Sequence, residues 1–268
     1  MASIASWIND KSLRGNYTFT HDEVMQEFLD MSAGSIARAL TREVSKGRIM
    51  SPLRGFYVIV PDEYVLRGAV PQSFYLDDMM RHLGRKYYVA LSSAASYHGV
   101  SHQVPLRFSV MIEPPAMRDK KGEKYLTHYF CKSHIPEAYV ERRQTRIGYI
   151  NVSCPELTAV DLLTYQAKIG SFSRAAIVLA ELADKLDFRR LSTDFVKEVP
   201  VTSLQRLGYI LDEVLEEDET AESAYSLLKY SGFVLQYVPL KTGKRSDGCE
   251  RNAKWRIIVN ETIGIGEL

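Results

Sequence analysis

One segment, SAGSIARALTREVSKGRIMSPLRGFYVI at residues 32–59, constrains the fold of this chain more than any other. Ser32 has the residue type of a helix N-cap, and Gly47 has that of a residue that ends a helix. At about 100° per residue, one sector of the helix between them is apolar and contains Ile36, Leu40, Val44, Ala33 and Ala37. The opposite sector is small and basic and contains Ser35, Arg38, Arg42, Ser45 and Lys46. The pattern predicts a helix with one core face and one basic face.

The segments on either side of this helix predict a winged helix-turn-helix. Downstream, the β-prone runs RIM and FYVIV flank SPLRG, in which Pro52 and Gly55 favour a tight turn. Upstream, Thr20 and Glu23 have the spacing of a capping box that starts a second helix. The apolar stripe of that helix is Val24, Phe28 and Leu29, and an earlier helix is expected around Ile4, Trp7, Ile8 and Leu13. Three helices followed by a hairpin are the elements of a winged helix.

This region is locally basic, although the chain as a whole is not. The chain has 34 Lys and Arg against 33 Asp and Glu, so attraction to an anionic partner must come from clustered charge. Between Ser32 and Val58 the single acid Glu43 faces five basic residues, Arg38, Arg42, Lys46, Arg48 and Arg54, a balance of +4. A winged helix that reads DNA needs small and basic residues on its last helix and its wing. The pattern favours DNA binding, and the alternatives are a solvated helix face or a winged helix that binds another protein.

The cysteines and the hydropathy pattern predict a cytoplasmic protein. Cys131, Cys154 and Cys249 are far apart and form no C-x-x-C pair, so neither a disulfide framework nor a thiolate metal site is expected. The N-terminal MASIASWINDKSLRG lacks the pattern of a signal peptide, and no window approaches about 18 consecutive apolar residues. We therefore expect neither export nor a membrane span.

The rest of the chain predicts a second, α+β domain. Pro61 and Pro71 bracket a connector, so we expect a winged helix at residues 1–60, a connector at 61–72 and a second domain at 73–268. Helices are expected near residues 74–83 and 89–97, before three strand-like runs, LRFSVMIEP, KYLTHYFCKS and GYINVSC. Helical spacing returns in PELTAVDLLTYQAK, SRAAIVLAELADKL and VTSLQRLGYILDEVL, and a short strand is expected in KWRIIVN. The predicted fold class is α+β, with a small sheet and several helices after the winged helix.

Four segments, in order along most of the chain, resemble the AbiEi-type antitoxins. They are GRIMSPLRGFYVIVPDEY, YLDDMMRHLGRKYYVALSSAASYHGVSHQVP, INVSCPELTAVDLL and NAKWRIIVN. AbiEi-type antitoxins are the transcriptional-regulator half of bacterial abortive-infection, type IV toxin-antitoxin systems. The resemblance implies a winged helix that binds promoter repeats and represses its own operon. It also implies a C-terminal domain that counteracts a nucleotidyltransferase toxin without a stable complex.

Carried onto this sequence, the resemblance implies double-stranded operator DNA as a partner. The implied DNA-binding residues are Ser35, Arg38, Arg42, Ser45 and Lys46 in the helix and Arg48 and Arg54 in the wing. No single residue is implied for the antitoxin role. The nearest candidate is a second basic surface in LKTGKRSDGCERNAKW, where Lys241, Lys244, Arg245, Arg251 and Lys254 outweigh Asp247 and Glu250 by three. It would bind a nucleic acid or a protein partner, and the favoured alternative is a solvated loop.

No pattern for enzymatic chemistry is found, so we expect neither a catalytic residue nor a cofactor. A metal-dependent nuclease is the enzymatic alternative, but Glu181, Asp184 and Lys185 lie in a helical pattern that does not provide its acidic metal site. In HYFCKSH, His128 and His134 would share one face of a strand and Cys131 would lie on the other, so no metal site is expected. Glycine loops that bind phosphate and a G-x-S-x-G nucleophile are also absent from the sequence.

Overall fold

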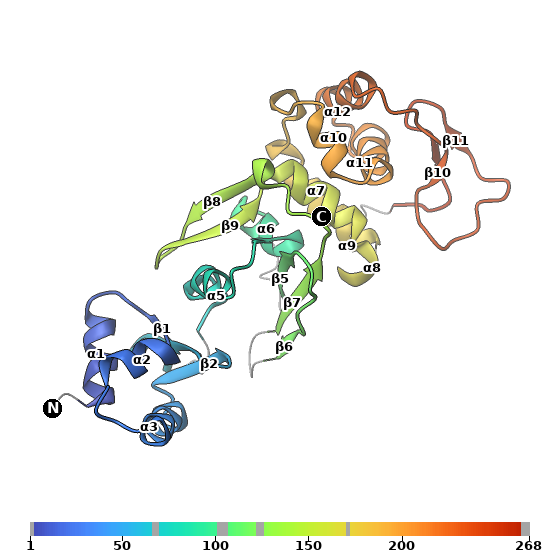
Figure 1. Ribbon diagram of the computed structural model, residues 1–268. Helices are drawn as coiled ribbons and strands as arrows, with labels where there is room; N and C mark the ends of the chain where they lie inside the picture. The colour runs from blue at the N-terminus through green and yellow to red at the C-terminus, as the bar shows by residue number, and fades with distance from the viewer. Residues whose placement is uncertain (1–2, 66–69, 101–106, 122–125, 170–171, 264–268) are drawn as a thin grey trace. The chain divides into compact units, whose positions relative to one another are not determined.

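The chain has a mixed α+β fold, as the sequence predicts (Figure 1). The computed structural model describes residues 3–65, 70–100, 107–121, 126–169 and 172–263. Contacts between Cα atoms divide the chain into two compact units. The first contains Met1–Tyr88, Leu106–Ile135 and Arg142–Asn151, and the second contains Val89–Pro105, Pro136–Glu141 and Val152–Leu268. The domain boundaries expected at residues 60 and 72 stay a prediction, and residues 66–69 of the expected connector lie outside the described residues.

The first unit begins with a winged helix. Its elements are α1 (Ile4–Leu13), β1 (Thr18–Thr20), α2 (His21–Glu27), α3 (Ala33–Ser45), β2 (Ile49–Leu53) and β3 (Phe56–Ile59). The strands form an antiparallel sheet in the order β1-β3-β2. The three predicted helices and the predicted hairpin are present, which confirms the winged-helix pattern. Strand β1 was not predicted, because its three residues are too few to show an alternating pattern.

Local capping explains where the helices of the winged helix begin. Thr20 and Glu23 form the predicted capping box at the start of α2, and Ser32 Oγ accepts a hydrogen bond from Ser35 N at 3.2 Å at the start of α3. The shared core contains Ile4, Ile8, Phe19, Val24, Ile36, Ala39, Leu40, Ile49 and Ile59. The placement of Leu29 on the core stripe was wrong: α2 ends at Glu27, and Leu29 is 83% exposed.

The core face of α3 also differs from the predicted one. Ala33, Ala37 and Val44 were expected in the core, but all three are exposed. The buried face consists of Ile36, Ala39, Leu40 and Glu43. The buried face of α3 is therefore rotated about the helix axis from the predicted one, so that it includes Glu43, which hydropathy alone assigns to solvent.

A six-stranded sheet follows the winged helix. Before it come α4 (Asp62–Val65), the 3-10 turn η1 (Gln72–Phe74) and α5 (Leu76–His82). The strands are β4 (Tyr87–Val89), β5 (Arg107–Ile112), β6 (Lys120–Lys121), β7 (Leu126–Cys131), β8 (Val140–Gln144) and β9 (Tyr149–Ser153). Their order is β6-β7-β5-β4-β9-β8, with β5–β7 and β4–β9 parallel. The division between the units runs through β4, β8 and β9. The three predicted runs correspond to β5, β7 and β9. Residue 106 at the start of the first run and residues 124–125 at the start of the second lie outside the described part of the chain.

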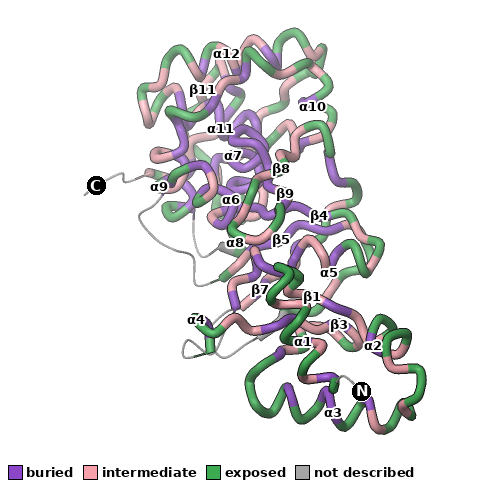
Figure 2. Tube along the Cα trace, turned by 90° about the vertical axis from the view of Figure 1, so that its left-hand side faces the viewer, coloured by how far each residue is buried: buried purple, intermediate pink, exposed green. Residues whose placement is uncertain are grey.

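The second unit is mainly helical. Its helices are α6 (Leu91–Tyr97), α7 (Pro155–Thr164), α8 (Gln166–Ile169), α9 (Phe172–Leu182), α10 (Asp194–Glu198), α11 (Val201–Glu213) and α12 (Asp218–Tyr230). It also has the 3-10 turns η2 (Glu137–Tyr139), η3 (Ala183–Lys185) and η4 (Phe188–Arg190) and the short strands β10 (Val238–Pro239), β11 (Arg251–Asn252) and β12 (Ile257–Ile258). Figure 2 shows α7 and α11 mostly buried. They form the centre of this core, and the fully buried Trp255 packs against α11.

Candidate nucleic-acid interface

The exposed face of α3 carries two arginines one helical turn apart. Arg38 and Arg42 are both exposed, and neither has an acidic partner among the described residues. Arg38 Nη2 donates to Ser35 Oγ at 3.3 Å. Gly34 and Ala37 are exposed beside them and add no bulk. This face therefore combines free positive charge with a backbone that another molecule can approach closely.

The two predicted serines make local hydrogen bonds on α3. Ser35 Oγ lies 3.0 Å from Ser32 Oγ, within the cap of the helix. Ser45 Oγ donates to Thr41 O at 2.9 Å. Both hydroxyl groups keep acceptor capacity, so each can receive a further hydrogen bond at this face.

Lys46 and Arg48, which are predicted to bind DNA, share a carboxylate of the same chain. Glu43 is 5% exposed, and it accepts from Lys46 Nζ at 2.9 Å and from Arg48 Nη1 at 3.3 Å. Burial acts to raise the pKa of Glu43, but the hydrogen bonds and charges of Lys46 and then Arg48 outweigh burial, and the pKa lies below its ordinary value. Both cations still expose more than half of their side chains. The balance of +4 in this segment is unchanged, because it already counts Glu43, but within the segment only Arg38, Arg42 and Arg54 remain without an acidic partner among the described residues.

The wing is short and its tip is attached to α2. Leu53 pairs with Phe56, so the loop consists of Arg54 and Gly55, the latter at φ +78°. Gly55 O accepts from His21 N at 2.8 Å, and Arg54 is exposed without a carboxylate partner in the described part of the chain. The tight turn predicted from Pro52 and Gly55 is present, with Pro52 inside β2 and Gly55 at the tip. Arg54 is therefore presented on a fixed turn.

Most of the second basic surface is paired. Lys241 and Lys244 form ion pairs with Glu261, and Lys254 Nζ lies 3.0 Å from Asp212 and 3.4 Å from Glu222. The guanidinium of Arg251 lies 5.3 Å from the centre of the Tyr237 ring. Arg245 is exposed and has no partner among the described residues. The five residues do not form one free cationic patch.

The residues considered for metal or nuclease chemistry are engaged in ordinary pairs. His128 Nδ1 lies 2.9 Å from Asp119, and His134 Nδ1 lies 3.5 Å from Glu113. Lys185 pairs with Asp184 at 2.7 Å. In the described ranges, no group of three or more His, Cys, Asp or Glu side chains is arranged to hold a metal ion. The three cysteines are free, and burial raises the pKa of the Cys154 thiol.

The exposure of Ala37 and Thr41 on the same face of α3 was not predicted from the sequence. The signal was the i,i+3 spacing of Glu43 and Lys46, which allows a buried carboxylate to be neutralised locally. Reading Glu43 as a core position would have moved the apolar sector away from Ala37.

No helix in the described residues has the length and apolarity that crossing a bilayer requires.

Comparisons with known proteins agree with this fold. A family model described as the AbiEi antitoxin C-terminal domain matches residues 87–213. The chain is similar to the crystal structure of RV2827C protein from Mycobacterium tuberculosis, with a TM-score of 0.65 and 16% identity, over 94% of this chain and 89% of that chain. No curated protein matches the chain. Residues 87–213, nearly half of the chain, are thus similar to the C-terminal domain of AbiEi antitoxins.

Proposed function

We propose that this protein is a non-enzymatic, cytoplasmic transcriptional regulator and antitoxin of a type IV toxin-antitoxin system. It binds operator DNA through α3 and the wing and represses its own operon. Its C-terminal domain counteracts a nucleotidyltransferase toxin without forming a stable complex. The match of residues 87–213 to the AbiEi antitoxin C-terminal domain supports the antitoxin role. The observation that carries the DNA-binding role is the pair Arg38 and Arg42 on an exposed helix face lined by Gly34 and Ala37.

The residues have different roles in this proposal. Arg38 and Arg42 contact bases or phosphates in the major groove, with Ser35 and Ser45 at the two ends of the same face. Arg54 contacts phosphate from the wing tip. Lys46 and Arg48 stay bound to Glu43 and contribute only their remaining hydrogen-bonding capacity.

Fluorescence anisotropy tests the DNA-binding role directly. The full chain is titrated into the fragment upstream of its own gene and into a shuffled fragment of the same length, at two salt concentrations. We expect tighter binding to the upstream fragment and weaker binding at the higher salt concentration. Equal affinity for both fragments would contradict operator recognition.

A growth assay tests the antitoxin role separately. The chain is co-expressed with the nucleotidyltransferase encoded beside it, and growth is compared with expression of the nucleotidyltransferase alone. We expect rescue by the full chain and also by the double variant Arg38→Ala, Arg42→Ala, because the antitoxin role is assigned outside α3. Failure of the full chain to rescue growth would contradict the antitoxin role and leave the DNA-binding result standing.

A second candidate function is a winged helix that binds a protein. Two large apolar side chains of the winged helix support it, since Leu13 is 78% exposed and Leu29 is 83% exposed. Salt separates the two functions, because counterion release makes DNA binding steeply salt-dependent. No binding to either fragment at low salt would favour the protein-binding function.

A further inference from the structure

A cavity in the first unit lies outside the α3 face and has no role in the proposed function. Its volume is about 680 Å³, and it is lined by α1, β1, the start of α2, α5 and the β8–β9 hairpin. This volume is within the range of about 300 to 1,000 Å³ that is typical of small-molecule sites. All of the lining residues belong to the first unit.

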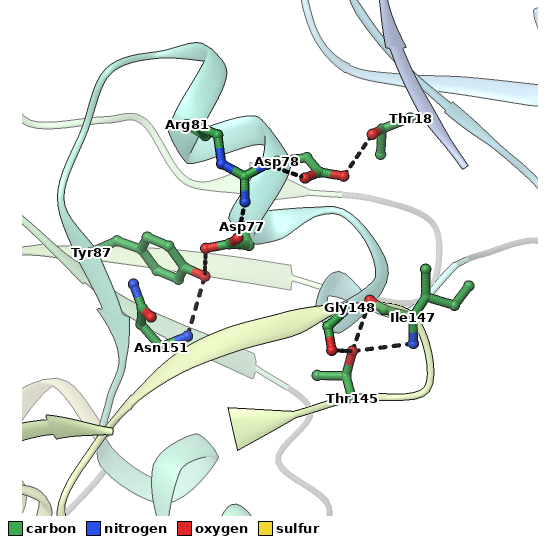
Figure 3. A network of polar contacts seen from close by, with 9 residues as sticks. All are labelled: Thr18, Asp77, Asp78, Arg81, Tyr87, Thr145, Ile147, Gly148 and Asn151. Atoms are coloured by element: carbon green, nitrogen blue, oxygen red, sulfur yellow. Dashed lines mark hydrogen bonds and ion pairs between the residues drawn. The ribbon is translucent and has the colours of Figure 1, made fainter. Parts of the chain in front are cut away.

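A network of polar contacts fixes the walls of the cavity (Figure 3). Thr18 Oγ1 on β1 donates to Asp78 Oδ2 on α5 at 2.7 Å. Tyr87 Oη donates to Asp77 Oδ1 at 2.9 Å and accepts from Asn151 N at 3.3 Å. Burial, and then the charge of Asp77, raises the pKa of Tyr87, so its hydroxyl stays a donor. The winged helix, α5, β4 and β9 are thereby connected around one preformed space.

The acids of the lining are already paired. Glu23 forms an ion pair with Lys11 at 2.6 Å, and Arg81 bridges Asp77 and Asp78. Arg142 is different: its guanidinium has no acidic partner in the described part of the chain. Arg142 is therefore the lining arginine that no carboxylate of the described residues holds, and it lies on β8.

An aromatic ring holds that charge at the cavity. The guanidinium carbon of Arg142 lies 4.4 Å from the centre of the Tyr149 ring. Tyr149 is an exposed aromatic residue, with 45% of its surface accessible, and it lines the same cavity. Stacking on a ring reduces the freedom of the arginine and leaves its N–H groups available for an anion.

We infer that this cavity binds a small ligand with a flat apolar body and one anionic group, a phosphate or a carboxylate. The anion pairs with Arg142, and the flat body lies against Tyr149 and Tyr17, which also lines the cavity.

Calorimetry on the full chain tests this site with defined probes. The probes are adenosine 5′-monophosphate, indole-3-acetate and, as an uncharged control, adenosine. We expect at least one of the two anionic probes to bind about tenfold or more tightly than adenosine, because adenosine cannot form the charge-assisted hydrogen bond to Arg142. Binding of only the nucleotide identifies a phosphate ligand, and binding of only indole-3-acetate identifies a carboxylate ligand.

Three variants make the test specific. Arg142→Ala should weaken binding of the anionic probe by about tenfold or more. Arg142→Lys should weaken binding less, because lysine keeps the positive charge but lacks the planar guanidinium that stacks on Tyr149. Arg118→Ala removes another exposed arginine of the first unit that does not line the cavity, and it should leave binding unchanged. Arg142 is itself exposed, so its replacement should leave the melting temperature unchanged. Absence of binding by both anions, equal binding by adenosine, or equal loss in the Arg118 and Arg142 variants would overturn the inference.

Discussion

Trp255 occupies the space that a side chain on residue 208 would need. A Cβ atom at Gly208 would lie 1.9 Å from Cζ3 of Trp255 and 2.2 Å from Cη2. The indole is fully buried, and its Nε1 donates to Asp212 Oδ2 at 2.7 Å, so it has no room to move away. The segment after α12 therefore closes on α11 only because residue 208 lacks a side chain.

Gly208→Ala should destabilise the protein by about 1 to 3 kcal/mol or more, because it overpacks a rigid core. The substitution would favour the helix through its intrinsic propensity, so a loss of stability isolates the clash with Trp255. Urea denaturation followed by tryptophan fluorescence measures the change. A variant as stable as the parent would show that Trp255 moves away at little cost.

Gly34→Ala is the matched substitution and should have the opposite effect on stability. Gly34 lies in α3, and a Cβ there would meet nothing within 4 Å. We expect a gain of up to about 1 kcal/mol in unfolding free energy, since alanine restricts the unfolded chain more than glycine. The same methyl group should weaken operator binding if the first turn of α3 lies close to DNA. Unchanged affinity would show that this turn stays away from the groove.

Glu43→Gln should destabilise the winged helix by about 1 to 3 kcal/mol at pH 7, since two charge-assisted hydrogen bonds lose their acceptor charge. The pKa of Glu43 is lowered in the folded state, so its stabilising contribution is present above the ordinary value of 4.5 and is lost as the pH falls through the lowered value. The difference between parent and variant should therefore shrink below about pH 4.5. Denaturation at several pH values measures it, and a difference independent of pH would contradict the ion-pair explanation.

Arg38→Ala and Arg42→Ala should each weaken operator binding. A loss of about 1 to 3 kcal/mol confined to the operator indicates contact with a base edge, whereas an equal loss on shuffled DNA indicates contact with phosphate. Arg118→Ala is exposed and outside the winged helix, so it serves as the control. Anisotropy titrations of all three variants provide the comparison, and parent-like affinity in both α3 variants would refute the helix assignment.

The salt dependence of DNA binding should show whether Lys46 and Arg48 stay paired with Glu43. If they do, only Arg38, Arg42 and Arg54 contact phosphate, and the slope of log binding constant against log salt concentration should be about −3 per bound chain. Glu43→Gln should release Lys46 and Arg48 to contact phosphate, and the slope should then steepen to about −4 to −5. Titrations over a salt series measure both slopes, and a parent slope already near −5 would show that DNA displaces Glu43.

Local sequence signals predicted the elements of the winged helix. The six-stranded sheet was predicted less completely, because its strands pair with residues far apart in the sequence. The caps at Thr20 and Ser32 and the turn at Gly55 depend on neighbours within a few residues, which the sequence displays. Strands β4 and β8 give no such signal, because β4 has only three residues and β8, VERRQ, is largely polar and half-exposed. The parallel pairs join residues such as Val89 and Val152, and no local pattern predicts that pairing.

At the candidate site, residue types were predicted better than their electrostatic state. Arg38, Arg42 and Arg54 are exposed on the predicted elements, and whether they bind DNA stays a prediction. Burial of Glu43 depends on tertiary packing of α3, so its capture of Lys46 and Arg48 could not be read from charge counts. The cavity near Arg142 brings together residues from four parts of the sequence and gave no local signal at all.

The interleaving of the two compact units affects the order in which the chain folds during synthesis. The winged helix is complete once β3 has left the ribosome, so it can fold while most of the chain is still being made. The first unit, however, needs Arg142–Asn151 before it is complete, and by then the first segments of the second unit have already emerged. Translation thus presents the winged helix long before residues 87–213, which match the antitoxin domain, are complete. A truncated nascent product would carry the winged helix alone.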